Sequence, residues 1–364
     1  MFISGLQIRH IARNVQQKVM GISVGVIGGY HGGNLGDMAL GESAATRLGE
    51  RKIKTGLQTI YNLEKWPSAP YAIVGGGAVG YADSFIRVAK RYKGNFNKVA
   101  LLGVDYNEKT YSGECLELIK GAAYLSCRSQ AQAERMMLLS GRKDISSHPD
   151  IAFSLYRDFC VNHRVKLQHK TNKVMLVNII PLYGKLENNQ VVSSDQYQSE
   201  RPELYESFDQ MHTSYRNYVR GVVIKAIADG YEVQTIPFTP QDATFGEFLL
   251  EGLNVKHTEY HSDPLRMIKH MATAAVVLAT RYHATIFALK LGIPLYPVAY
   301  AVKNELLLQD LGVNRDQFLS TVDLANGKEH ISEPVEVNVE LINKYEIKST
   351  AAIDAAVAAL NIND

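Results

Sequence analysis

Residues 281–303 hold the side chains with the clearest chemistry in the chain: Arg281, His283 and Lys303. They follow an apolar run at 275–279 that predicts a buried parallel strand, so Arg281 and His283 stand where this strand ends and a helix begins. In α/β sheets ligands bind at the carboxyl ends of strands, and a helix N-terminus there favours an anion. A forked cation, an imidazole and an ammonium group at this place predict a phosphate or carboxylate site.

A second interpretation ties Arg281 and His283 into hydrogen bonds between domains. Two positions apart, the two side chains project to the same side if the strand continues that far. The Gly-Ile-Pro sequence at 292–294 and Tyr300, which stands three residues before Lys303, favour the binding site.

A glycine-rich loop follows the first predicted strand and ends in Asp37. It has neither the GxGxxG spacing of a dinucleotide site nor the GxxxxGK[ST] pattern of a P-loop, so its glycines indicate only a sharp turn or a close backbone approach. Gly33 and Asn34 are candidate binding residues of this loop. Asp37 caps the following helix on one interpretation. On the other, its carboxylate binds sugar hydroxyls or acts as a base.

Further candidates stand at the ends of later strands. Gly76 and Gly77 belong to a glycine triplet that would let a ligand approach bare backbone N–H groups, although a tight turn explains it nearly as well. Arg128 follows the fourth strand on the ligand side of the sheet. The alternative is that Ser129 caps the next helix and Arg128 is solvated. Asp150 either caps a turn or faces the ligand.

His257, His261 and Asp263 are close enough in sequence to raise the question of a metal site. A predicted strand ends between the two histidines, so they need not share a face, and no clustered cysteine or carboxylate completes a ligand set. Surface histidines are the favoured interpretation, and no metal is expected.

Short apolar runs alternate with helical patterns along the whole chain, which predicts parallel, doubly wound sheets. In the first half, strands are expected at 22–28, 71–74, 99–104 and 123–127, and helices at 37–49, 82–92, 111–121 and 129–140. In the second half, strands are expected at 174–180, 231–237, 255–257, 275–279 and 295–298, and helices at 207–229, 242–252, 263–273 and 284–291.

The α/β pattern is interrupted once, at residues 157–173, which are polar and basic and predict an interdomain connection. We therefore expect two Rossmann-like domains, 1–165 and 166–345, that face each other across a cleft. The alanine-rich end, 346–364, is expected to form a helix that returns to the first domain. The long polar segment at 183–206 is either disordered or a functional lid.

Composition narrows the class of protein. The 364 residues include 46% hydrophobic and 21% charged residues, which is typical of a soluble globular protein, and a formal charge of +2 argues against a nucleic-acid partner. No apolar stretch approaches the ~18–20 residues of a membrane span, and the start lacks the features of a secretory signal. Cys115, Cys127 and Cys160 have no metal-type spacing and suit a reducing cytosol, so a cytoplasmic protein is expected.

Residues 6–19 form a basic, mildly amphipathic segment. The plainer interpretation is an ordinary helix that packs on the body of the protein. The alternative is peripheral docking on the anionic inner face of a membrane.

The motifs together resemble the polysaccharide pyruvyl transferase family. Its C-terminal signature is similar to Arg281-Tyr282-His283-Ala284, Gly292-Ile293-Pro294 and Tyr300-x-x-Lys303, and its N-terminal signature to the loop from Gly29 to Asp37. In the expected order between them stand Gly75–Gly77, Arg128-Ser129, Asp150-x-Ala152-Phe153 and Pro237-Phe238 with Asp242. The resemblance spans roughly residues 24–312. Met38 and Ile151 depart from it, since the family often has an acidic residue and a proline there.

The resemblance implies a two-domain fold like that of glycosyltransferase-B enzymes. It also implies transfer of pyruvate from phosphoenolpyruvate, as donor substrate, onto two hydroxyls of a sugar as a cyclic ketal. The acceptor would belong to a cell-surface polysaccharide or its lipid-linked precursor. The donor would lie on the C-terminal domain and the acceptor on the N-terminal domain, with no cofactor required.

The local chemistry fits this reaction. Phosphoenolpyruvate carries a phosphate and a carboxylate, which Arg281, Lys303 and the helix start can bind. Ketal formation needs a proton for the methylene carbon and a base for the attacking hydroxyl. His283 and Asp37 are the candidates, and the sequence leaves open which is the acid and which the base.

Two other functions compete with the transferase. One is a nucleotide-sugar glycosyltransferase of the same two-domain class, in which Arg281 and Lys303 would hold a diphosphate. No carboxylate suited to grip ribose hydroxyls stands near 281–303, which argues against it. The other is a non-catalytic carbohydrate-binding relative, in which some of the 20 tyrosines would stack on sugars.

Overall fold

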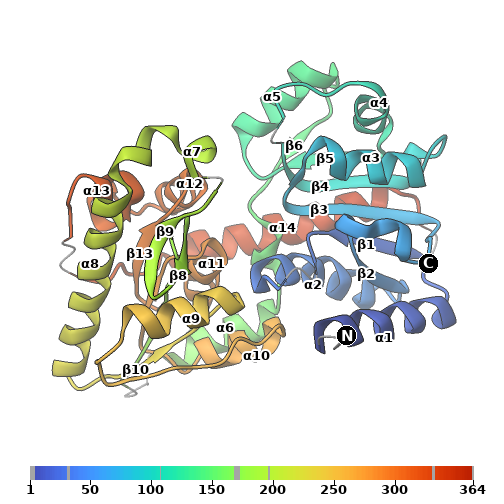
Figure 1. The fold of residues 1–364 in the computed structure, drawn as a ribbon. Helices are drawn as coiled ribbons and strands as arrows, with labels where there is room; N and C mark the ends of the chain where they lie inside the picture. Colours follow the sequence, from blue (N-terminus) through green and yellow to red (C-terminus); the bar gives the residue numbers. More distant parts are fainter. Residues whose placement is uncertain are drawn as a thin grey trace. The chain divides into compact units, whose positions relative to one another are not determined.

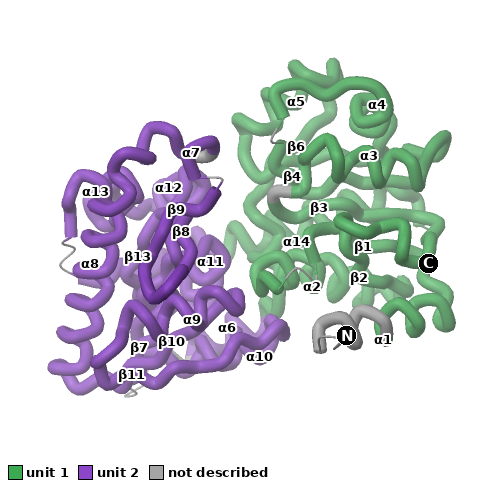
Figure 2. The backbone as a smooth tube through the Cα atoms, viewed as in Figure 1, with its two compact units in different colours: residues 1–157, 343–364 green, residues 158–342 purple. Residues whose placement is uncertain are grey.

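The chain folds into two compact units (Figure 2). Unit 1 comprises Met1–Arg157 and Asn343–Asp364, and unit 2 comprises Asp158–Ile342. Each contains one six-stranded sheet whose strands all run parallel. The two Rossmann-like α/β units expected from the sequence are therefore confirmed. The computed structural model describes residues 5–30, 33–106, 108–167, 173–195, 197–329 and 333–362.

In unit 1 the strands lie in the order β2-β1-β3-β4-β5-β6. Connections therefore run in opposite directions from β1 and from β3, and the crevice between their carboxyl ends is where such a sheet binds ligands. The strands are β1 (Val24–Gly28), β2 (Thr55–Thr59), β3 (Tyr71–Gly80), β4 (Val99–Tyr106), β5 (Tyr124–Cys127) and β6 (Ser146–Ser147). The helices are α1 (Gly5–Met20), α2 (Leu35–Glu50), α3 (Ala82–Arg91), α4 (Gly113–Gly121), α5 (Gln130–Ser140) and α14 (Val339–Ala359), with short 3-10 turns at Ile60–Lys65, Phe96–Lys98 and Ile151–Ser154 (Figure 1).

In unit 2 the order is β11-β10-β7-β12-β13-β14, which in chain order is the 3-2-1-4-5-6 arrangement of dinucleotide-binding folds. Its switch point lies between β7 and β12. The strands are β7 (Val174–Asn178), β10 (Glu232–Thr235), β11 (Val255–Lys256), β12 (Val276–Ala279), β13 (Leu295–Ala299) and β14 (Leu319–Ser320). The helices are α6 (Arg157–Leu167), α8 (Phe208–Ala228), α9 (Pro240–Leu249), α10 (Pro264–Met271), α11 (Tyr282–Leu291), α12 (Val302–Asp310) and α13 (Thr321–Ala325), with a 3-10 turn at Arg315–Gln317.

Central strands are buried on both faces. Every residue of β1, β12 and β13 is buried, because helices cover the two sides of a parallel sheet. Helix α11 is buried along its entire length, so the helix that follows Arg281 is fixed from all sides. A rigid framework thus holds the ends of β12 and β13.

The segment 157–173 contains a helix, so the prediction of a simple connection was wrong. Helix α6 lacks a strong apolar period because polar side chains anchor it: His163 lies 3.1 Å from the carbonyl of Leu291 and 2.8 Å from that of Ala272. Arg164 donates to the carbonyl of Lys290. These bonds attach α6 to unit 2, and the division of the chain accordingly falls at Arg157 rather than at residue 165.

The segment 183–206 is not a structureless loop. It forms the antiparallel hairpin of β8 (Gly184–Glu187) and β9 (Gln190–Ser193), then α7 (Tyr197–Glu200) and a 3-10 turn at Pro202–Ser207. The hairpin was missed because its turn is Asn188-Asn189, both with positive φ, rather than a glycine turn.

The C-terminal helix α14 packs within unit 1. Arg47 donates to both carboxylate oxygens of Asp354, at 2.8 and 2.7 Å, and Ser349 donates to the carbonyl of Asp150 at 3.0 Å. Among the described residues, no helix is both long and apolar enough to span a bilayer. The cleft expected between the two domains stays a prediction.

Candidate functional site

The switch point of unit 2 brings Asn178 and Arg281 together. Asn178 ends β7, and its side-chain oxygen accepts a hydrogen bond from the backbone N–H of Arg281, just beyond β12, at 2.7 Å. The Asn178 amide nitrogen donates to the carbonyl of Ile236 at 2.9 Å. One buried amide therefore joins three neighbouring strand ends and fixes the position at which α11 begins.

The guanidinium of Arg281 is held by Asp242 of α9. Nε donates to Oδ2 at 3.0 Å and Nη2 to Oδ1 at 2.6 Å, while Nη2 also contacts the Thr239 hydroxyl at 3.3 Å. Asp242 in turn accepts from the backbone N–H groups of Phe238 and Thr239. The Asp242 side chain is wholly buried and that of Arg281 is 21% exposed, so the pair orients the arginine firmly.

Helices α11 and α12 begin side by side. They follow the paired strands β12 and β13, and neither Arg281 nor Ala301, their N-cap residues, caps the helix with its side chain. The Asn304 amide donates to the carbonyl of Thr280 at 3.4 Å, which links the two starts. Two helix N-termini at one place make a favourable location for an anion.

Lys303 lies between two tyrosine rings at these helix starts. Its Nζ is 5.3 Å from the centre of the Tyr282 ring and 5.5 Å from that of Tyr300. No carboxylate within the described part of the chain forms an ion pair with Lys303. Its positive charge is stabilised by ring faces and not neutralised, which suits an anionic ligand.

His283 occupies the first turn of α11. Its ring is buried and meets the Tyr282 ring nearly at right angles, with centroids 5.3 Å apart. Tyr282 therefore contacts both the His283 ring and the Lys303 ammonium group. The structure thus brings Arg281, His283, Tyr300 and Lys303 together in unit 2, as the sequence predicts for this stretch.

The segment after β7 also contacts Tyr300. Tyr183 donates to the Tyr300 carbonyl at 2.9 Å, and Arg201 approaches the Tyr183 hydroxyl at 3.1 Å and the Thr321 hydroxyl at 3.2 Å. The Arg201 guanidinium lies 5.5 Å from the Tyr183 ring centre. The sequence did not single out Tyr183 or Arg201, because they are brought to Tyr300 from about 100 residues away.

In unit 1 the switch point holds Asp37. The hydroxyl of Tyr30 donates to the Gly75 carbonyl at 2.6 Å, which ties the end of β1 to β3. Burial raises the pKa of the Tyr30 phenol, and the nearby Asp37 carboxylate raises it further. Burial and the same carboxylate also raise the pKa of Tyr61. Asp37 thus lies among two phenols and the glycine loop, half-buried in the first turn of α2.

The helix cap expected of Asp37 belongs to Asn34. Its side-chain oxygen accepts a hydrogen bond from the Gly36 N–H at 2.9 Å, as an N-cap residue does. Gly33 precedes it with a φ of +79°, a conformation that favours glycine. The structural roles of Gly33 and Asn34 are therefore clear without a ligand.

The glycine triplet is explained largely by packing. A Cβ at Gly75 would lie 2.0 Å from the Leu102 carbonyl oxygen, and a Cβ at Gly76 would lie 2.6 Å from that of Leu40. Gly77 differs, since its nearest polar neighbour is Asp37, at 3.8 Å from a built Cβ. Of the triplet, Gly77 is the position beside the carboxylate.

Arg128 is neither solvated nor presented as a simple cation. It donates to Asp105 through Nε at 2.9 Å and to Asp150 through Nη1 at 2.7 Å, and its side chain is buried. Asp150 also caps the turn at Ile151 by accepting from the Ala152 N–H. Two carboxylates around one guanidinium brace the ends of β4 and β5, so Arg128 and Asp150 have a structural role independent of substrate.

The histidines of the possible metal site have ordinary contacts. His261 accepts a hydrogen bond from the Asp263 N–H at 3.1 Å, and Asp263 caps α10. His257 is exposed. Within the described ranges, no group of three His, Cys, Asp or Glu side chains could hold a metal ion.

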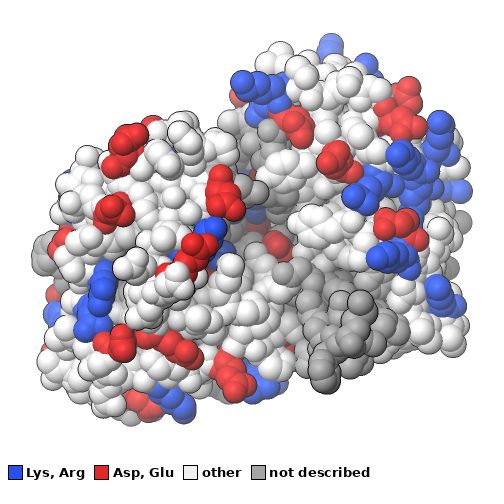
Figure 3. Space-filling view, in the orientation of Figure 1, with Lys and Arg blue, Asp and Glu red and all other residues white. Residues whose placement is uncertain are grey.

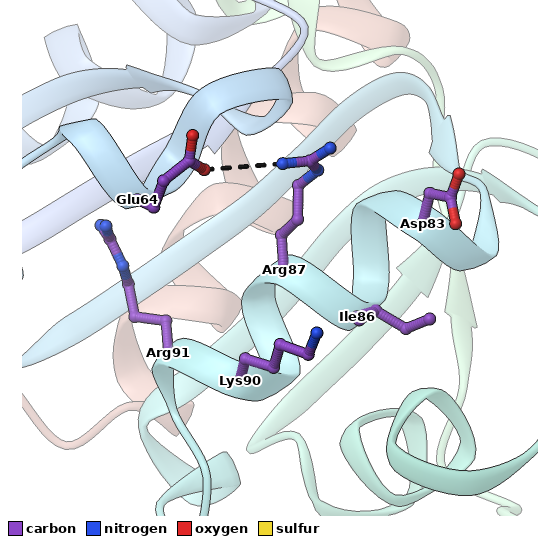
Figure 4. Close-up of a pocket in the computed structure, with 6 residues that line it drawn as sticks. All are labelled: Glu64, Asp83, Ile86, Arg87, Lys90 and Arg91. Atoms are coloured by element: carbon purple, nitrogen blue, oxygen red, sulfur yellow. Dashed lines mark hydrogen bonds and ion pairs between the residues drawn. The ribbon is translucent and has the colours of Figure 1, made fainter.

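A surface cavity of about 660 Å³ on unit 1 is lined by Glu64, Asp83, Ile86, Arg87, Lys90 and Arg91 (Figure 4). Arg87 points toward Glu64 at 3.5 Å, and Arg91 is committed to backbone carbonyls, including that of Trp66 at 3.0 Å. Basic and acidic side chains mix on this face of unit 1 (Figure 3). Arg87 and Arg91 already have partners in the protein, and we propose no function for this cavity.

Two partners in the site had only weak signals in the sequence. Asn178 ends a predicted strand, and a polar residue at that point is a general sign of a ligand-side position. Asp242 follows Thr239-Pro240, the signature of a helix start with a capping box, which is present. Neither signal indicates that these residues contact Arg281.

The sequence matches a family model described as "Polysaccharide pyruvyl transferase" over residues 34–301. No curated protein matches it. Among solved structures, the UDP-GlcNAc 2-epimerase of Methanocaldococcus jannaschii is 11% identical, with 92% of this chain and 99% of that chain covered and a TM-score of 0.46. The corresponding values are 10%, 93%, 99% and 0.44 for the epimerase of Neisseria meningitidis. For an uncharacterised protein of Klebsiella pneumoniae they are 14%, 87%, 98% and 0.42.

Proposed function

Because the chain belongs to the polysaccharide pyruvyl transferase family, we propose that it transfers pyruvate from phosphoenolpyruvate to a saccharide. The product is a cyclic ketal on two sugar hydroxyls, and inorganic phosphate is released. The acceptor is a sugar of a cell-surface polysaccharide or of its lipid-linked precursor. The three cysteine thiols are buried, which suits a reducing compartment, and we place the reaction in the cytoplasm.

One observation carries the donor assignment: Lys303 stands between two tyrosine rings where two helices begin without side-chain caps. A ligand with both a phosphate and a carboxylate matches two helix N-termini, a lysine and an oriented arginine. The Arg281 side chain is 21% exposed, and its charge is largely balanced by Asp242. We therefore assign Arg281 to orienting the donor through hydrogen bonds more than to supplying positive charge.

The reaction moves two protons. The two hydroxyl oxygens of the acceptor form bonds to the central carbon of phosphoenolpyruvate, and the carbon–oxygen bond to phosphate breaks. The acceptor loses two hydroxyl protons. The methylene carbon gains one proton and becomes a methyl group, and the released phosphate takes up the other. Positioned acids and bases lower the barriers of these transfers.

His283 is our candidate for proton transfer on the donor side, because it lies beside Tyr282 and thereby near Lys303. Asp37, in unit 1, is our candidate for binding or deprotonating the acceptor hydroxyl, with Gly77 beside it. Both assignments of acid and base are compatible with these positions.

A phosphate-release screen tests the function. The full chain is incubated with phosphoenolpyruvate and a panel of galactosyl, mannosyl and aminosugar acceptors, with Arg281→Ala as the inactive reference. We expect release with at least one acceptor, a pyruvyl ketal in the product by mass spectrometry, and neither with the variant. Near-wild-type release by Arg281→Ala would contradict the assignment.

A thermal-shift assay shows whether the protein binds phosphoenolpyruvate or a nucleotide sugar. Phosphoenolpyruvate should raise the melting temperature, since a ligand that binds only the folded state stabilises it. Stabilisation by nucleotide sugars and not by phosphoenolpyruvate would favour a glycosyltransferase instead. Saccharide binding without phosphate release would favour a non-catalytic relative.

A further inference from the structure

The last two turns of α1 present apolar side chains to solvent. Val15, Val19 and Met20 keep 55%, 82% and 54% of their surface exposed. A surface helix of a globular protein normally turns its apolar side to the core and its polar side to water. In this part of α1 the arrangement is reversed.

Polar side chains make the inward contacts. Gln17 is buried, and its amide donates to the Leu57 carbonyl on β2 at 2.9 Å. One turn earlier, Asn14 donates to the Lys65 carbonyl at 2.6 Å. These two bonds fix the face that α1 turns to the sheet, so the outward position of the valines follows from specific anchoring.

Gly56 makes the anchoring possible. A Cβ at this position of β2 would lie 2.4 Å from the Gln17 amide carbon, which no side chain allows. Strand β2 is the edge of its sheet, and α1 lies alongside it (Figure 1). The helix thus covers an edge strand with its polar face, while Val15, Val19 and Met20 stay exposed within the part of the chain that the structure describes.

The charge around the apolar face is positive. Residues 1–36 contain no aspartate or glutamate, while α1 carries Arg13 and an exposed Lys18. A groove of about 260 Å³ beside Met20 is lined by Arg13 and Lys54, with Glu42 as its one acidic residue. The protein as a whole has a formal charge of only +2, so this concentration is local.

We propose that α1 docks on an anionic lipid surface. Val15, Val19 and Met20 enter the headgroup region, and Lys18 contacts the anionic headgroups. Apolar side chains flanked by basic ones are what an interfacial helix needs, and a wholly protein partner would not require the absence of acidic residues. The proposal concerns a surface of unit 1 and does not depend on the reaction assigned above.

Vesicle sedimentation tests the proposal. The full chain is mixed with vesicles of phosphatidylglycerol and phosphatidylcholine, or of phosphatidylcholine alone, at low and high salt. We expect binding to the anionic vesicles at low salt only. Val19→Glu should abolish it, and Lys18→Gln, which removes one positive charge, should weaken it about fivefold.

Leu138→Glu is the matched control, because Leu138 on α5 is also an exposed apolar residue of unit 1, at 87%. It should bind anionic vesicles as the wild type does, and melting curves should show all variants folded. Wild-type protein that stays in solution with both kinds of vesicle would overturn the proposal. Equal loss in Leu138→Glu, or unchanged binding by Val19→Glu, would overturn it as well.

Sedimentation velocity examines the competing occupant, a second copy of this chain. A dimer that dissociates in Val19→Glu, together with no vesicle binding, would assign the face to self-association and reject the lipid surface. A monomer that binds vesicles supports the proposal.

Discussion

Arg281 and Asp242 form a two-point ion pair, with Nε 3.0 Å from Oδ2 and Nη2 2.6 Å from Oδ1. The residues lie 39 positions apart in sequence and meet across the switch point of unit 2. The Asp242 carboxylate is wholly buried and accepts hydrogen bonds from the backbone N–H groups of Phe238 and Thr239. The pair therefore fixes the direction of the arginine and leaves little freedom to either partner.

Asp242→Ala should lower the free energy of unfolding by about 3–5 kcal/mol, because it leaves a largely buried guanidinium without its partner. Urea denaturation measures the change. Asp195→Ala removes a carboxylate that is 91% exposed and should change stability by less than about 0.5 kcal/mol. Equal stability of the two variants would show that the Arg281–Asp242 pair contributes nothing.

Lys303→Met should raise the KM for phosphoenolpyruvate about 10- to 100-fold, the usual effect of losing a hydrogen bond to a charged group. The turnover number should change less, since Lys303 is assigned to binding. Steady-state phosphate release measures both constants. Lys269→Met, on the exposed side of α10, is the control and should behave as the wild type. An unchanged KM in Lys303→Met argues against the donor site.

His283→Ala should lower the turnover number by about 10²–10⁴-fold, the range that general acid–base groups contribute. Phosphoenolpyruvate should still protect the variant against thermal unfolding, because Lys303 and the helix starts remain. His257→Ala changes an exposed histidine and should keep full activity. Comparable activity of the two variants would remove His283 from the mechanism.

Gly75→Ala should destabilise the protein by about 3 kcal/mol. The residue has a φ of +146°, and a Cβ would lie 2.0 Å from the Leu102 carbonyl oxygen, so backbone strain and a clash add. Gly94 also has a positive φ, +76°, but a Cβ there would have no neighbour within 4 Å. Gly94→Ala should therefore lower the free energy of unfolding by only about 1 kcal/mol. Thermal melts compare them, and equal losses would mean that close packing at β3 is unimportant.

Acidification should destabilise unit 2 through His212. Burial lowers the pKa of His212 to about 4, with its Nε2 3.1 Å from the Leu182 carbonyl. The unfolded chain takes up this proton near pH 6.5, whereas the folded protein takes it up only near pH 4. Between these values the unfolded state binds more protons, so stability is lost as the pH is lowered from 6.5 to about 4, by about 3 kcal/mol at most.

His212→Gln should remove this component, because glutamine can donate to the same carbonyl and does not titrate. Denaturation at pH 7 and pH 4 measures the difference for each protein. His257→Gln is the exposed control and should retain the wild-type pH dependence. If His212→Gln loses as much stability on acidification as the wild type, another group is responsible.

The local pattern predicted much of the core. The apolar run at 276–279 and the αL glycine at Gly292 delimit β12 and α11, so Arg281 and His283 were correctly placed at a strand end and a helix start. Short edge strands were harder: β6 and β14 have two residues each and carry no readable period. Helix α6 was missed because its anchors are polar, His163 and Arg164.

The sequence by itself determined that the chain alternates strands and helices, that Arg281 and His283 stand between a strand and a helix, and which family the motifs resemble. Periodicity and motif spacing are local properties, so they can be read without the fold. Only the tertiary structure decided which side chains meet. It paired Arg281 with Asp242 and Arg128 with Asp105 and Asp150, and placed Lys303 between Tyr282 and Tyr300. Such contacts depend on strand order, which brings distant segments to one edge of a sheet and leaves no period in the chain.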